Sequence, residues 1–421
     1  MLELFPDTAL VEDGVLAVGG CRTTDLAAEH GTPLLVYCEA TIRARAGAYR
    51  AAAPDALIVY GTKAFPNVAI LRLLADEGLG ADVSTLGELA FARAAGVPPQ
   101  RLVVHGNNKT DEELRAAAEA GAAYVVLDAP DEAERAAAAG VRRVLVRVTP
   151  GIEAETHEAI RTAHRGSKFG LPPEHALEAI AAALEAGLDT AGIHVHVGSQ
   201  LLDATASLAT VAWLAAFAAR ARAELDWTPG VVDLGGGLGI AYVEDEPAPE
   251  PQSYVAALLE ELDREWALHD LPRPLVVLEP GRSLVGVAGL TLYEVGAVKQ
   301  ATETTTWAAI DGGMSDNPRP QLYGARLTAL LANRADEEPT GAYGIAGKHC
   351  ESGDVLIERA LLPRPRRGDL LAVAATGAYT LAMGSNYNVV PRPAVVLAAD
   401  GHATVIRRRE SVDELLRYEE G

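Results

Sequence analysis

Short apolar runs alternate with segments of helical pattern along most of the chain, and this alternation constrains the fold more than any other feature. Most of the runs are rich in Val, Ile and Leu and do not alternate with polar residues, which is typical of strands covered on both faces. The first five recur at a spacing of roughly 22 residues, the length of one βα unit. The expected strands are Leu57–Tyr60, Gly80–Val83, Leu102–His105, Tyr124–Leu127, Val144–Val148, Ile193–Val197, Val231–Leu234 and Leu275–Glu279.

Eight βα units in series predict an α/β fold built on a (β/α)8 TIM-like barrel, with functional side chains at the carboxyl ends of its strands. A doubly wound open sheet is the alternative, and the count of eight disfavours it. After about Gly289 strand-like runs follow one another with turns between them and little helix, which predicts a C-terminal all-β domain. We therefore expect a barrel over residues 34–288 and a β domain formed by residues 1–33 and 289–421.

Composition excludes several classes of protein. The chain has 421 residues, more than a single core usually holds, and its net charge of −22 argues against nucleic acid and anionic membranes as partners. No apolar run is long enough for a membrane span, and Met1–Gly20 lacks the basic start and apolar stretch of a secretory signal. The three cysteines form neither a disulfide framework nor a CxxC metal pattern, which favours a reducing cytoplasm.

Lys63 directly follows the first expected strand, in the stretch Tyr60-Gly-Thr-Lys63-Ala-Phe-Pro-Asn67. An ammonium that leaves water needs a partner or gives up its charge, so a lysine at the end of a buried strand is an expensive residue. A Schiff base with an aldehyde cofactor is one reason to keep it there. A lysine on a surface loop is the alternative.

A run of glycines, Gly235-Gly236-Gly237, follows the seventh expected strand. Consecutive glycines allow backbone N–H groups to close on an anion, and barrels often bind phosphate after strands seven and eight. The run is not a dinucleotide-binding fingerprint, because its glycines are contiguous and Tyr242 stands where the last glycine would be needed. A tight turn without a ligand is the alternative.

Polar residues also end the sixth and eighth expected strands. His194 and His196 are two positions apart and so would share a face. They could bind a metal ion, one of them could stack on an aromatic cofactor whose phosphate Ser199 binds, or they could be core histidines. Glu279 could pair with the ring nitrogen of pyridoxal phosphate, and Arg282 could hold a phosphate or a carboxylate, unless the two serve a structural ion pair.

Three motifs in the expected β domain carry further candidates: Asp311-Gly-Gly-Met-Ser-Asp-Asn-Pro-Arg319-Pro-Gln-Leu-Tyr323, Cys350-Glu351-Ser-Gly-Asp354 and Gly377-Ala-Tyr379. Their charged and phenolic groups would suit an amino-acid substrate that carries additional carboxylate and ammonium groups. Cys350 could donate a proton, since a thiol is a weak acid. A buried, inert cysteine is the alternative.

In this order the motifs resemble those of diaminopimelate decarboxylases, fold-type III pyridoxal-phosphate enzymes related to the barrel-containing ornithine and arginine decarboxylases. The resemblance runs from about Pro33 to Arg392, and the ordered set is far more specific than any single motif. The matching stretches are YGTKAFPN, GADVSTLGEL, GNNKTDEEL, GSKFGL, HVHVGSQ, DLGGGLG, EPGR, DGGMSDNPRPQLY, CESGD and GAYTLAMGSNYN.

The resemblance implies a role for each candidate. Lys63 would carry the cofactor, His196 would stack on its ring, and Glu279 would face the ring nitrogen. The other cofactor-binding positions would be Ser199, Gly235, Gly236, Gly237, Gly281, Arg282 and Tyr379. The substrate positions would be Arg282, Arg319, Tyr323, Glu351 and Tyr379. Cys350 would be the proton donor, reaching the active site from the other subunit of a dimer.

The resemblance further implies a carbon–carbon lyase that converts meso-2,6-diaminopimelate to L-lysine and CO2, the last step of lysine biosynthesis, with pyridoxal 5'-phosphate and no metal. The implied assembly is a cytoplasmic homodimer with active sites at the interface. Two departures bear on the substrate: Ala163 replaces the usual glycine in the long loop Thr149–Pro173, and Gly384 replaces the usual alanine. The alternatives are a decarboxylase of D-ornithine, D-lysine or a carrier-bound glutamyl group and, less favoured, a metal-dependent barrel hydrolase.

Overall fold

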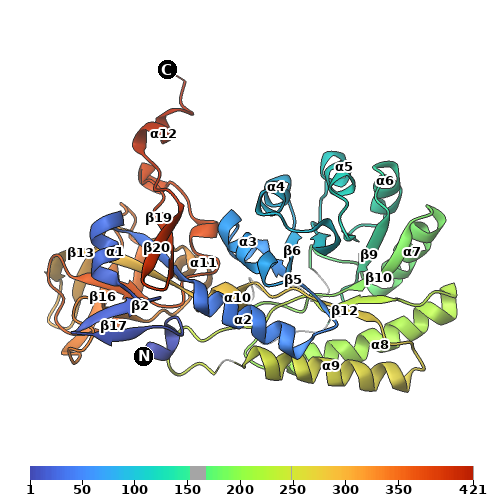
Figure 1. Ribbon diagram of the computed structural model, residues 1–421, viewed down its shortest axis with the longest axis horizontal. Helices are drawn as coiled ribbons and strands as arrows, with labels where there is room; N and C mark the ends of the chain where they lie inside the picture. Colours follow the sequence, from blue (N-terminus) through green and yellow to red (C-terminus); the bar gives the residue numbers. More distant parts are fainter. Residues whose placement is uncertain (152–166, 248, 421) are drawn as a thin grey trace. The chain divides into compact units, whose positions relative to one another are not determined.

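The computed structural model describes residues 1–151, 167–247 and 249–420. The chain divides into two compact units (Figure 1). The barrel unit comprises Arg45–Ile240 and Ala248–Ser283, and the β unit comprises Met1–Ala44, Ala241–Pro247 and Leu284–Gly421.

Eight parallel strands close into a barrel, which confirms the expected (β/α)8 architecture over the open sheet. The strands are β5 (Leu57–Gly61), β6 (Gly80–Val83), β7 (Leu102–Val104), β8 (Tyr124–Leu127), β9 (Arg143–Arg147), β10 (Asp189–His194), β11 (Val231–Asp233) and β12 (Leu275–Leu278). They follow one another around the barrel in chain order, and β12 closes on β5. Apolar side chains from seven of the eight strands meet in one core cluster.

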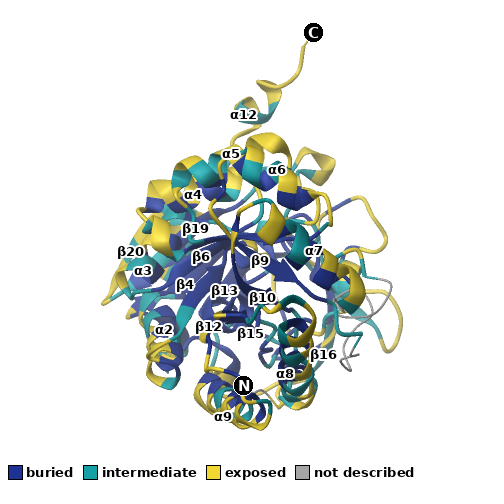
Figure 2. Ribbon diagram, turned by 90° about the vertical axis from the view of Figure 1, so that its right-hand side faces the viewer, coloured by how far each residue is buried: buried dark blue, intermediate teal, exposed yellow. Residues whose placement is uncertain are grey.

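Helices cover the outside of the barrel, and Figure 2 shows buried strands behind helices whose outer faces are exposed. The helices of this unit are α2 (Glu39–Ala52), which begins in the β unit, α3 (Val68–Asp76), α4 (Leu86–Ala95), α5 (Asp111–Ala120), α6 (Glu132–Ala138), α7 (Pro173–Glu185), α8 (Thr205–Leu225) and α9 (Pro251–Leu268). Local sequence fixes several ends: Thr110 and Glu113 form a capping box at the start of α5, and Gly121 ends it in the left-handed region. In the described part of the chain, no helix has the length and apolar character needed to cross a bilayer.

The sixth barrel strand differs from its expected position. It was expected over Ile193–Val197, whereas β10 begins at Asp189 and ends at His194. Its polar start and the irregular register between Thr190 and Gly192 hide the beginning of the strand from a pattern of apolar residues. Val195 and Val197 are buried beyond the strand end, so apolar character continues where sheet pairing stops.

The β unit contains a sheet of nine strands and a separate sheet of three. The larger sheet runs β17-β16-β14-β13-β4-β19-β20, with β15 and β18 joined to it through β13. Its strands are β4 (Leu34–Cys38), β13 (Gly289–Gln300), β14 (Thr306–Ile310), β15 (Ala329–Leu331), β16 (Gly341–Ala346), β17 (Val355–Leu362), β18 (Leu370–Val373), β19 (Ala394–Ala399) and β20 (His402–Arg407). The smaller sheet is β1 (Leu10–Glu12), β2 (Val15–Val18) and β3 (Cys21–Arg22). The helices are α1 (Thr23–His30), α10 (Arg282–Val285), which starts in the barrel unit, α11 (Arg319–Tyr323) and α12 (Val412–Leu416).

The unit boundary lies further along the chain than the expected break between residues 33 and 34. The first apolar strand after that break, β4, pairs with β13 and β19 in the large sheet and not with the barrel. Its five residues are all buried and a helix follows it, so in sequence it looks like the start of a βα unit. Its pairing partners are more than 250 residues away, and local pattern cannot reveal such partners.

Candidate active site

Buried polar side chains gather at the carboxyl ends of the barrel strands. Parallel strands bring these ends to one side of the barrel, where the side chains can meet. The set is Asp82 in β6, His105 directly after β7, Arg147 at the end of β9, His194 at the end of β10, Asp233 at the end of β11 and Glu279 directly after β12.

Lys63 lies in the short 3-10 turn Thr62–Ala64 that follows β5. Its Nζ atom lies 2.6 Å from Oδ2 of Asp82, whose side chain is only 1% exposed, whereas the lysine side chain is 48% exposed. Gly61 and Asp82 are register partners on β5 and β6, so strand pairing itself brings the two charges together. The amine is therefore anchored and still accessible to an aldehyde that enters from solvent.

Glu279 is held by two histidines. Nε2 of His105 lies 2.6 Å from Oε1 of Glu279, and Nε2 of His194 lies 3.5 Å from the same oxygen. His105 also lies 3.7 Å from Oδ1 of Asp82. A continuous line of polar contacts thus runs from Lys63 through Asp82 and His105 to Glu279.

The protonation of the cluster follows from its burial. Burial alone would raise the pKa of Glu279, but the two imidazoles beside it, His105 first and His194 second, outweigh the burial and hold that pKa well below its ordinary value. Burial and the charge of Glu279 raise the pKa of Asp233 well above its ordinary value. Burial also lowers the pKa of His194 to about 4, so at neutral pH it offers Glu279 a polar contact without charge. Glu279 is therefore an ionised carboxylate that can pair with a cationic ring nitrogen.

The glycine run after β11 is shaped by close backbone packing. Gly235 and Gly237 have φ of +67° and +107°, and a Cβ atom at Gly236 would lie 2.2 Å from the carbonyl oxygen of Glu279. Two of the N–H groups already have acceptors: Gly235 donates to Asp233 at 2.8 Å, and Gly236 donates to Nδ1 of His196 at 3.2 Å. For the N–H of Gly237, no acceptor lies within hydrogen-bond reach among the described residues. That single group, and not the whole run, is available to an anion.

Arg282 and Ser199 come together although 83 positions separate them in sequence. Nη2 of Arg282 donates to Oγ of Ser199 at 2.9 Å. Arg282 lies in the segment that follows β12, next to Gly281, and Ser199 lies in the segment that follows β10. Both residues therefore belong to the same end of the barrel. A guanidinium and a hydroxyl in contact are a suitable pair for binding phosphate.

His196 does not share a strand face with His194, because β10 ends at His194. Its Nδ1 accepts the hydrogen bond from Gly236, and burial, aided by the charge of Lys63, lowers the pKa of His196 to about 3. His196 is therefore neutral and carries its proton on Nε2. The metal-binding alternative for His194 and His196 gains no support, because His196 is not in the group of possible metal ligands found among the described residues.

Four possible ligand atoms, from His105, His194, Asp233 and Glu279, lie within 4.8 Å of one another. The contacts of His105 and His194 with Oε1 of Glu279, at 2.6 and 3.5 Å, bring these groups together, and burial beside Glu279 raises the pKa of Asp233. None of the four is exposed, and His196 is not among them.

In the β unit, Arg319 and Tyr323 lie at the two ends of α11. The guanidinium of Arg319 is buried and lies 4.7 Å from the ring centroid of Tyr242 and 5.8 Å from that of Tyr323. The hydroxyl of Tyr323 lies 3.8 Å from the sulfur of Met383. The guanidinium of Arg319 thus lies close to two aromatic rings.

The remaining candidates of this unit lie on turns. Cys350 is exposed, whereas Cys21 and Cys38 are buried, which excludes the alternative of a buried, inert Cys350. Glu351, next to it, is also exposed. Tyr379 is half-buried and adopts a left-handed conformation with φ of 56°.

Two residues of the line of contacts from Lys63 to Glu279 did not stand out as candidates in the sequence: Asp82 and His105. Asp82 lies within the expected strand Gly80–Val83, and His105 ends the expected strand Leu102–His105. The signal that could have found them is a charged or imidazole side chain at the end of an otherwise apolar barrel strand. Of the two departures, Ala163 lies outside the described residues. At Gly384 a Cβ atom would lie 2.8 Å from the carbonyl oxygen of Ser315, so an alanine there would require the backbone to shift.

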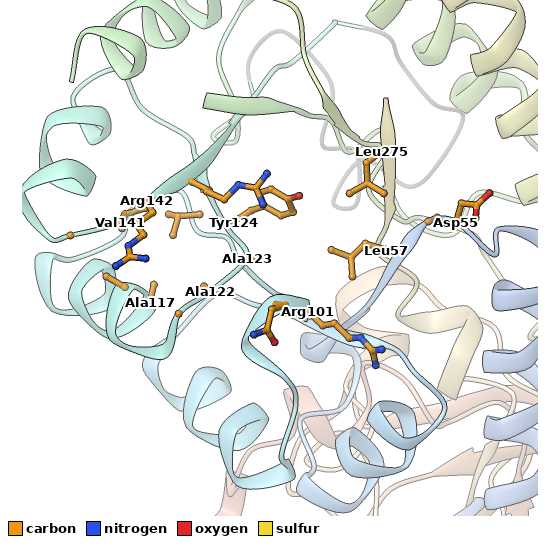
Figure 3. A pocket seen from close by; sticks show the side chains of 17 residues that line it. Asp55, Leu57, Arg101, Ala117, Ala122, Ala123, Tyr124, Val141, Arg142 and Leu275 are labelled. Atoms are coloured by element: carbon orange, nitrogen blue, oxygen red, sulfur yellow. The ribbon is translucent and has the colours of Figure 1, made fainter. Parts of the chain in front are cut away.

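A cavity of about 770 Å³ lies away from this network, at the amino ends of the barrel strands (Figure 3). Leu57, Tyr124 and Leu275, the first residues of β5, β8 and β12, contribute to its lining. In barrel enzymes this end serves stability, and chemistry lies at the other end.

The donor set at the carboxyl ends fits a phosphorylated aldehyde with a basic ring nitrogen. Lys63 offers an accessible primary amine. Arg282, Ser199 and the N–H of Gly237 offer donors for phosphate. Glu279 offers a buried, ionised carboxylate for the ring nitrogen.

Comparison with known proteins also indicates a protein that binds pyridoxal phosphate. Residues 39–286 match the family described as pyridoxal-dependent decarboxylase, pyridoxal binding domain. Diaminopimelate decarboxylase from Actinosynnema pretiosum subsp. auranticum is 43% identical over 422 aligned positions, which cover 99% of this chain and 95% of that protein. The crystal structure of diaminopimelate decarboxylase from M. jannaschii in complex with L-lysine has a TM-score of 0.92 and 34% identity, covering 99% of this chain and 98% of that one. A lysine/ornithine decarboxylase from Vibrio vulnificus, complexed with cadaverine, is more distant, with a TM-score of 0.77, 25% identity and coverage of 89% and 97%. The chain therefore belongs to the pyridoxal-dependent decarboxylases and, within that family, to the branch of the diaminopimelate decarboxylases.

Proposed function

We propose that this protein uses pyridoxal 5'-phosphate to decarboxylate meso-2,6-diaminopimelate to L-lysine and CO2, the last step of lysine biosynthesis. The observation that carries the proposal is the line of contacts from Lys63 through Asp82 and His105 to Glu279. It connects an accessible amine to an ionised carboxylate. The relatives named diaminopimelate decarboxylase, similar over nearly the whole chain, support this choice of substrate over lysine or ornithine.

Each barrel residue has a separate task in this proposal. Lys63 carries the cofactor through Nζ, and Asp82 orients that amine. Ser199, Arg282 and Gly237 bind the phosphate, while Gly235, Gly236 and Gly281 let the backbone approach it closely. His196 lies against the ring, and Glu279 keeps a proton on the ring nitrogen. The bound cofactor supplies an electron sink for the pair left behind by the departing carboxylate.

The β unit supplies the remaining groups. Cys350 delivers the proton that replaces the lost carboxylate on the substrate carbon. Arg319 holds the distal carboxylate with its fork of N–H donors, and Glu351 accepts hydrogen bonds from the distal ammonium. Tyr323 and Tyr379 complete the site.

We further propose that two copies of the chain form a homodimer in the cytoplasm. The barrel residues and Cys350 belong to different compact units, and each site would take its Cys350 from the partner chain. The charge of −22 disfavours nucleic acid and anionic membrane surfaces as partners.

The reaction is tested by measuring CO2 release from a panel of amino acids that includes meso-diaminopimelate, D-ornithine, L-ornithine, D-lysine and L-lysine. We expect CO2 from meso-diaminopimelate in at least tenfold preference, with L-lysine as the product by chiral chromatography. A Lys63→Ala chain purified in the same way is the control for contaminating activity. Preference for ornithine or lysine would overturn the proposed substrate while leaving the reaction class in place.

The carrier of the cofactor is tested separately by borohydride reduction and peptide mapping. The pyridoxyl group is expected on Lys63. The chain has only four other lysines to compare, Lys109, Lys168, Lys299 and Lys348. Lys109 is buried and bonded to Glu132, so it also reports whether label reaches lysines that the folded chain shields. Label on a lysine other than Lys63 would exclude the assignment.

A further inference from the structure

The turn that carries Cys350 is short and internally bonded. It connects β16, which ends at Ala346, to β17, which begins at Val355. Within it the N–H of Gly347 donates to the carbonyl of Asp354 at 2.9 Å, and the N–H of Asp354 donates to that of Glu351 at 3.1 Å. Cys350 lies at the exposed tip.

The inner side of the turn is fixed by the buried carboxylate of Asp354. One oxygen accepts from the N–H of Met314 at 2.8 Å, and the other accepts from the N–H and Nδ1 of His349 at 3.0 and 2.6 Å. A Cβ atom at Gly347 would lie 2.0 Å from this carboxylate, so the packing leaves no room for adjustment. The side chain of Asp354 is only 3% exposed. A substitution of Asp354 would therefore destabilise the fold and could not test the position of Cys350 separately.

The outer side of the turn has a different anchor. Oδ1 of Asn388 accepts a hydrogen bond from the backbone N–H of Cys350 at 2.8 Å. Asn388 is exposed, and its φ and ψ of 53° and 24° place it in the left-handed region, which asparagine and glycine tolerate better than other residues. Nothing in the packing of a core requires this side chain.

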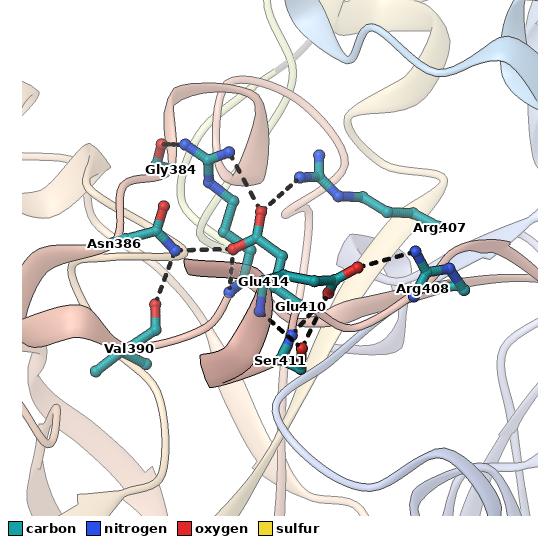
Figure 4. Close-up of polar contacts among 9 residues, drawn as sticks. Gly384, Asn386, Val390, Arg407, Arg408, Glu410, Ser411 and Glu414 are labelled. Carbon is teal, nitrogen blue, oxygen red and sulfur yellow. Dashed lines mark hydrogen bonds and ion pairs between the residues drawn. The ribbon is translucent and has the colours of Figure 1, made fainter. Parts of the chain in front are cut away.

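The segment that carries Asn388 is itself held in place, as Figure 4 shows. Nδ2 of Asn386 donates to Glu410 at 2.8 Å and to the carbonyl of Val390 at 3.0 Å. Glu410 also accepts from the backbone N–H of Arg392 at 2.9 Å. The carboxamide of Asn388 therefore projects from a fixed turn, and its contact can set the position of Cys350.

We propose that Asn388 is a positioning residue for Cys350. Its carboxamide oxygen fixes the main chain of the cysteine, and so the place from which the thiol delivers its proton. The inference rests on the proposed role of Cys350 as proton donor. A loosened tip would slow proton delivery more than it weakens substrate binding, because Arg319 and the groups proposed to bind the cofactor lie on other segments, and only Glu351 shares the turn.

The left-handed backbone of Asn388 allows a selective test. Asn388→Gly removes the carboxamide and keeps the backbone conformation, whereas Asn388→Asp keeps an acceptor oxygen. We expect Asn388→Gly to lower kcat about 5- to 10-fold with KM changed less than about 2-fold, and Asn388→Asp to recover most of the loss. Asp400→Gly makes the same kind of change at another exposed left-handed residue, in the turn between β19 and β20, and is expected to leave kcat unchanged.

Hydrogen exchange gives a readout that does not depend on activity. The amide of Cys350 should exchange faster in Asn388→Gly than in the unaltered holoenzyme, and Asn388→Asp and Asp400→Gly should retain its protection. Faster exchange in Asn388→Gly with an unchanged kcat would overturn the proposal. A loss of kcat in Asn388→Gly would also overturn it if Asn388→Asp failed to restore kcat, or if Asp400→Gly lost kcat to the same extent. Cys350→Ala distinguishes failure of this inference from failure of the proposed function on which it rests. Normal turnover of Cys350→Ala would refute the proton-donor role of Cys350 itself.

Discussion

Asp82 contacts both Lys63 and His105. One of its carboxylate oxygens lies 2.6 Å from Nζ of Lys63, and the other lies 3.7 Å from Nε2 of His105, which in turn lies 2.6 Å from Glu279. The residue is buried while the lysine is half exposed. A single carboxylate therefore connects Lys63, the proposed carrier of the cofactor, to the histidine that contacts Glu279.

Asp82→Asn should lower kcat by about 10- to 100-fold. The substitution keeps the shape of the side chain and removes its charge, and a hydrogen bond between charged groups contributes about 1.5–3 kcal/mol. Steady-state kinetics on cofactor-saturated enzyme measure the effect. Asp189→Asn removes the acid of an exposed pair with Arg143 and serves as the matched control, with kcat expected within about twofold of normal. Equal effects of the two substitutions would mean that Asp82 has no special role.

Glu279→Gln should slow turnover by several powers of ten while cofactor binding is largely kept. The amide cannot stabilise a proton on the ring nitrogen, and each tenfold loss corresponds to about 1.4 kcal/mol of transition-state stabilisation. The measurement compares kcat with the dissociation constant of pyridoxal phosphate from titration of its absorbance. A variant with nearly normal turnover would show that Glu279 only completes the ion pair with His105.

Much of this arrangement could be predicted from the sequence, because a barrel converts position along the chain into position in space. Each short buried run becomes a strand, and the residue after it reaches the same end as its counterparts, so Lys63, Ser199 and Glu279 could be grouped without coordinates. Asp82 was harder to find, because it lies within β6 and its importance depends on pairing with Gly61, which brings it beside the turn that carries Lys63.

The features that could not be predicted depend on contacts between residues far apart in the sequence. Leu34–Cys38 resembles a barrel strand, yet its partners in the large sheet lie far along the chain. Gly341–Ala346 forms a strand although its glycine and alanine residues give little strand pattern. The bond between Asn388 and Cys350 joins two turns, and no periodicity marks turn contacts.

The stability of the folded protein should fall as the pH is lowered through the window between about 6.5 and about 4, in part because of His194. Burial lowers the pKa of His194 from 6.5 to about 4, so in this window the unfolded chain binds a proton that the folded chain does not bind. Stability that is fully present above pH 6.5 is therefore lost as the pH falls. This residue alone should reduce the free energy of unfolding by about 2 kcal/mol between pH 7.5 and pH 5.

Urea unfolding of the unaltered chain and of His194→Gln at both pH values measures this contribution. The difference between the two pH values should shrink by about 2 kcal/mol in the variant. His402→Gln, at an exposed histidine in β20, should leave the difference unchanged. An unaltered pH dependence in His194→Gln would contradict the buried, neutral state of this imidazole.

Mixing two inactive chains should restore activity if each active site takes Cys350 from the partner subunit. Lys63→Ala removes the cofactor carrier from one barrel, and Cys350→Ala removes the proton donor from one β unit. In a mixed dimer one site combines the intact Lys63 of one chain with the intact Cys350 of the other. Random exchange makes half of the dimers mixed, so about a quarter of normal activity should return.

The matched control mixes Lys63→Ala with Glu279→Gln. Both substitutions lie in the barrel, so neither site of that mixed dimer has a complete barrel set, and activity should stay absent even though the chains exchange equally well. Native mass spectrometry of chains with different tags confirms the exchange. If the Lys63→Ala and Cys350→Ala mixture stays inactive despite proven exchange, the shared site is wrong, because Cys350 would then serve the barrel of its own chain or no barrel at all.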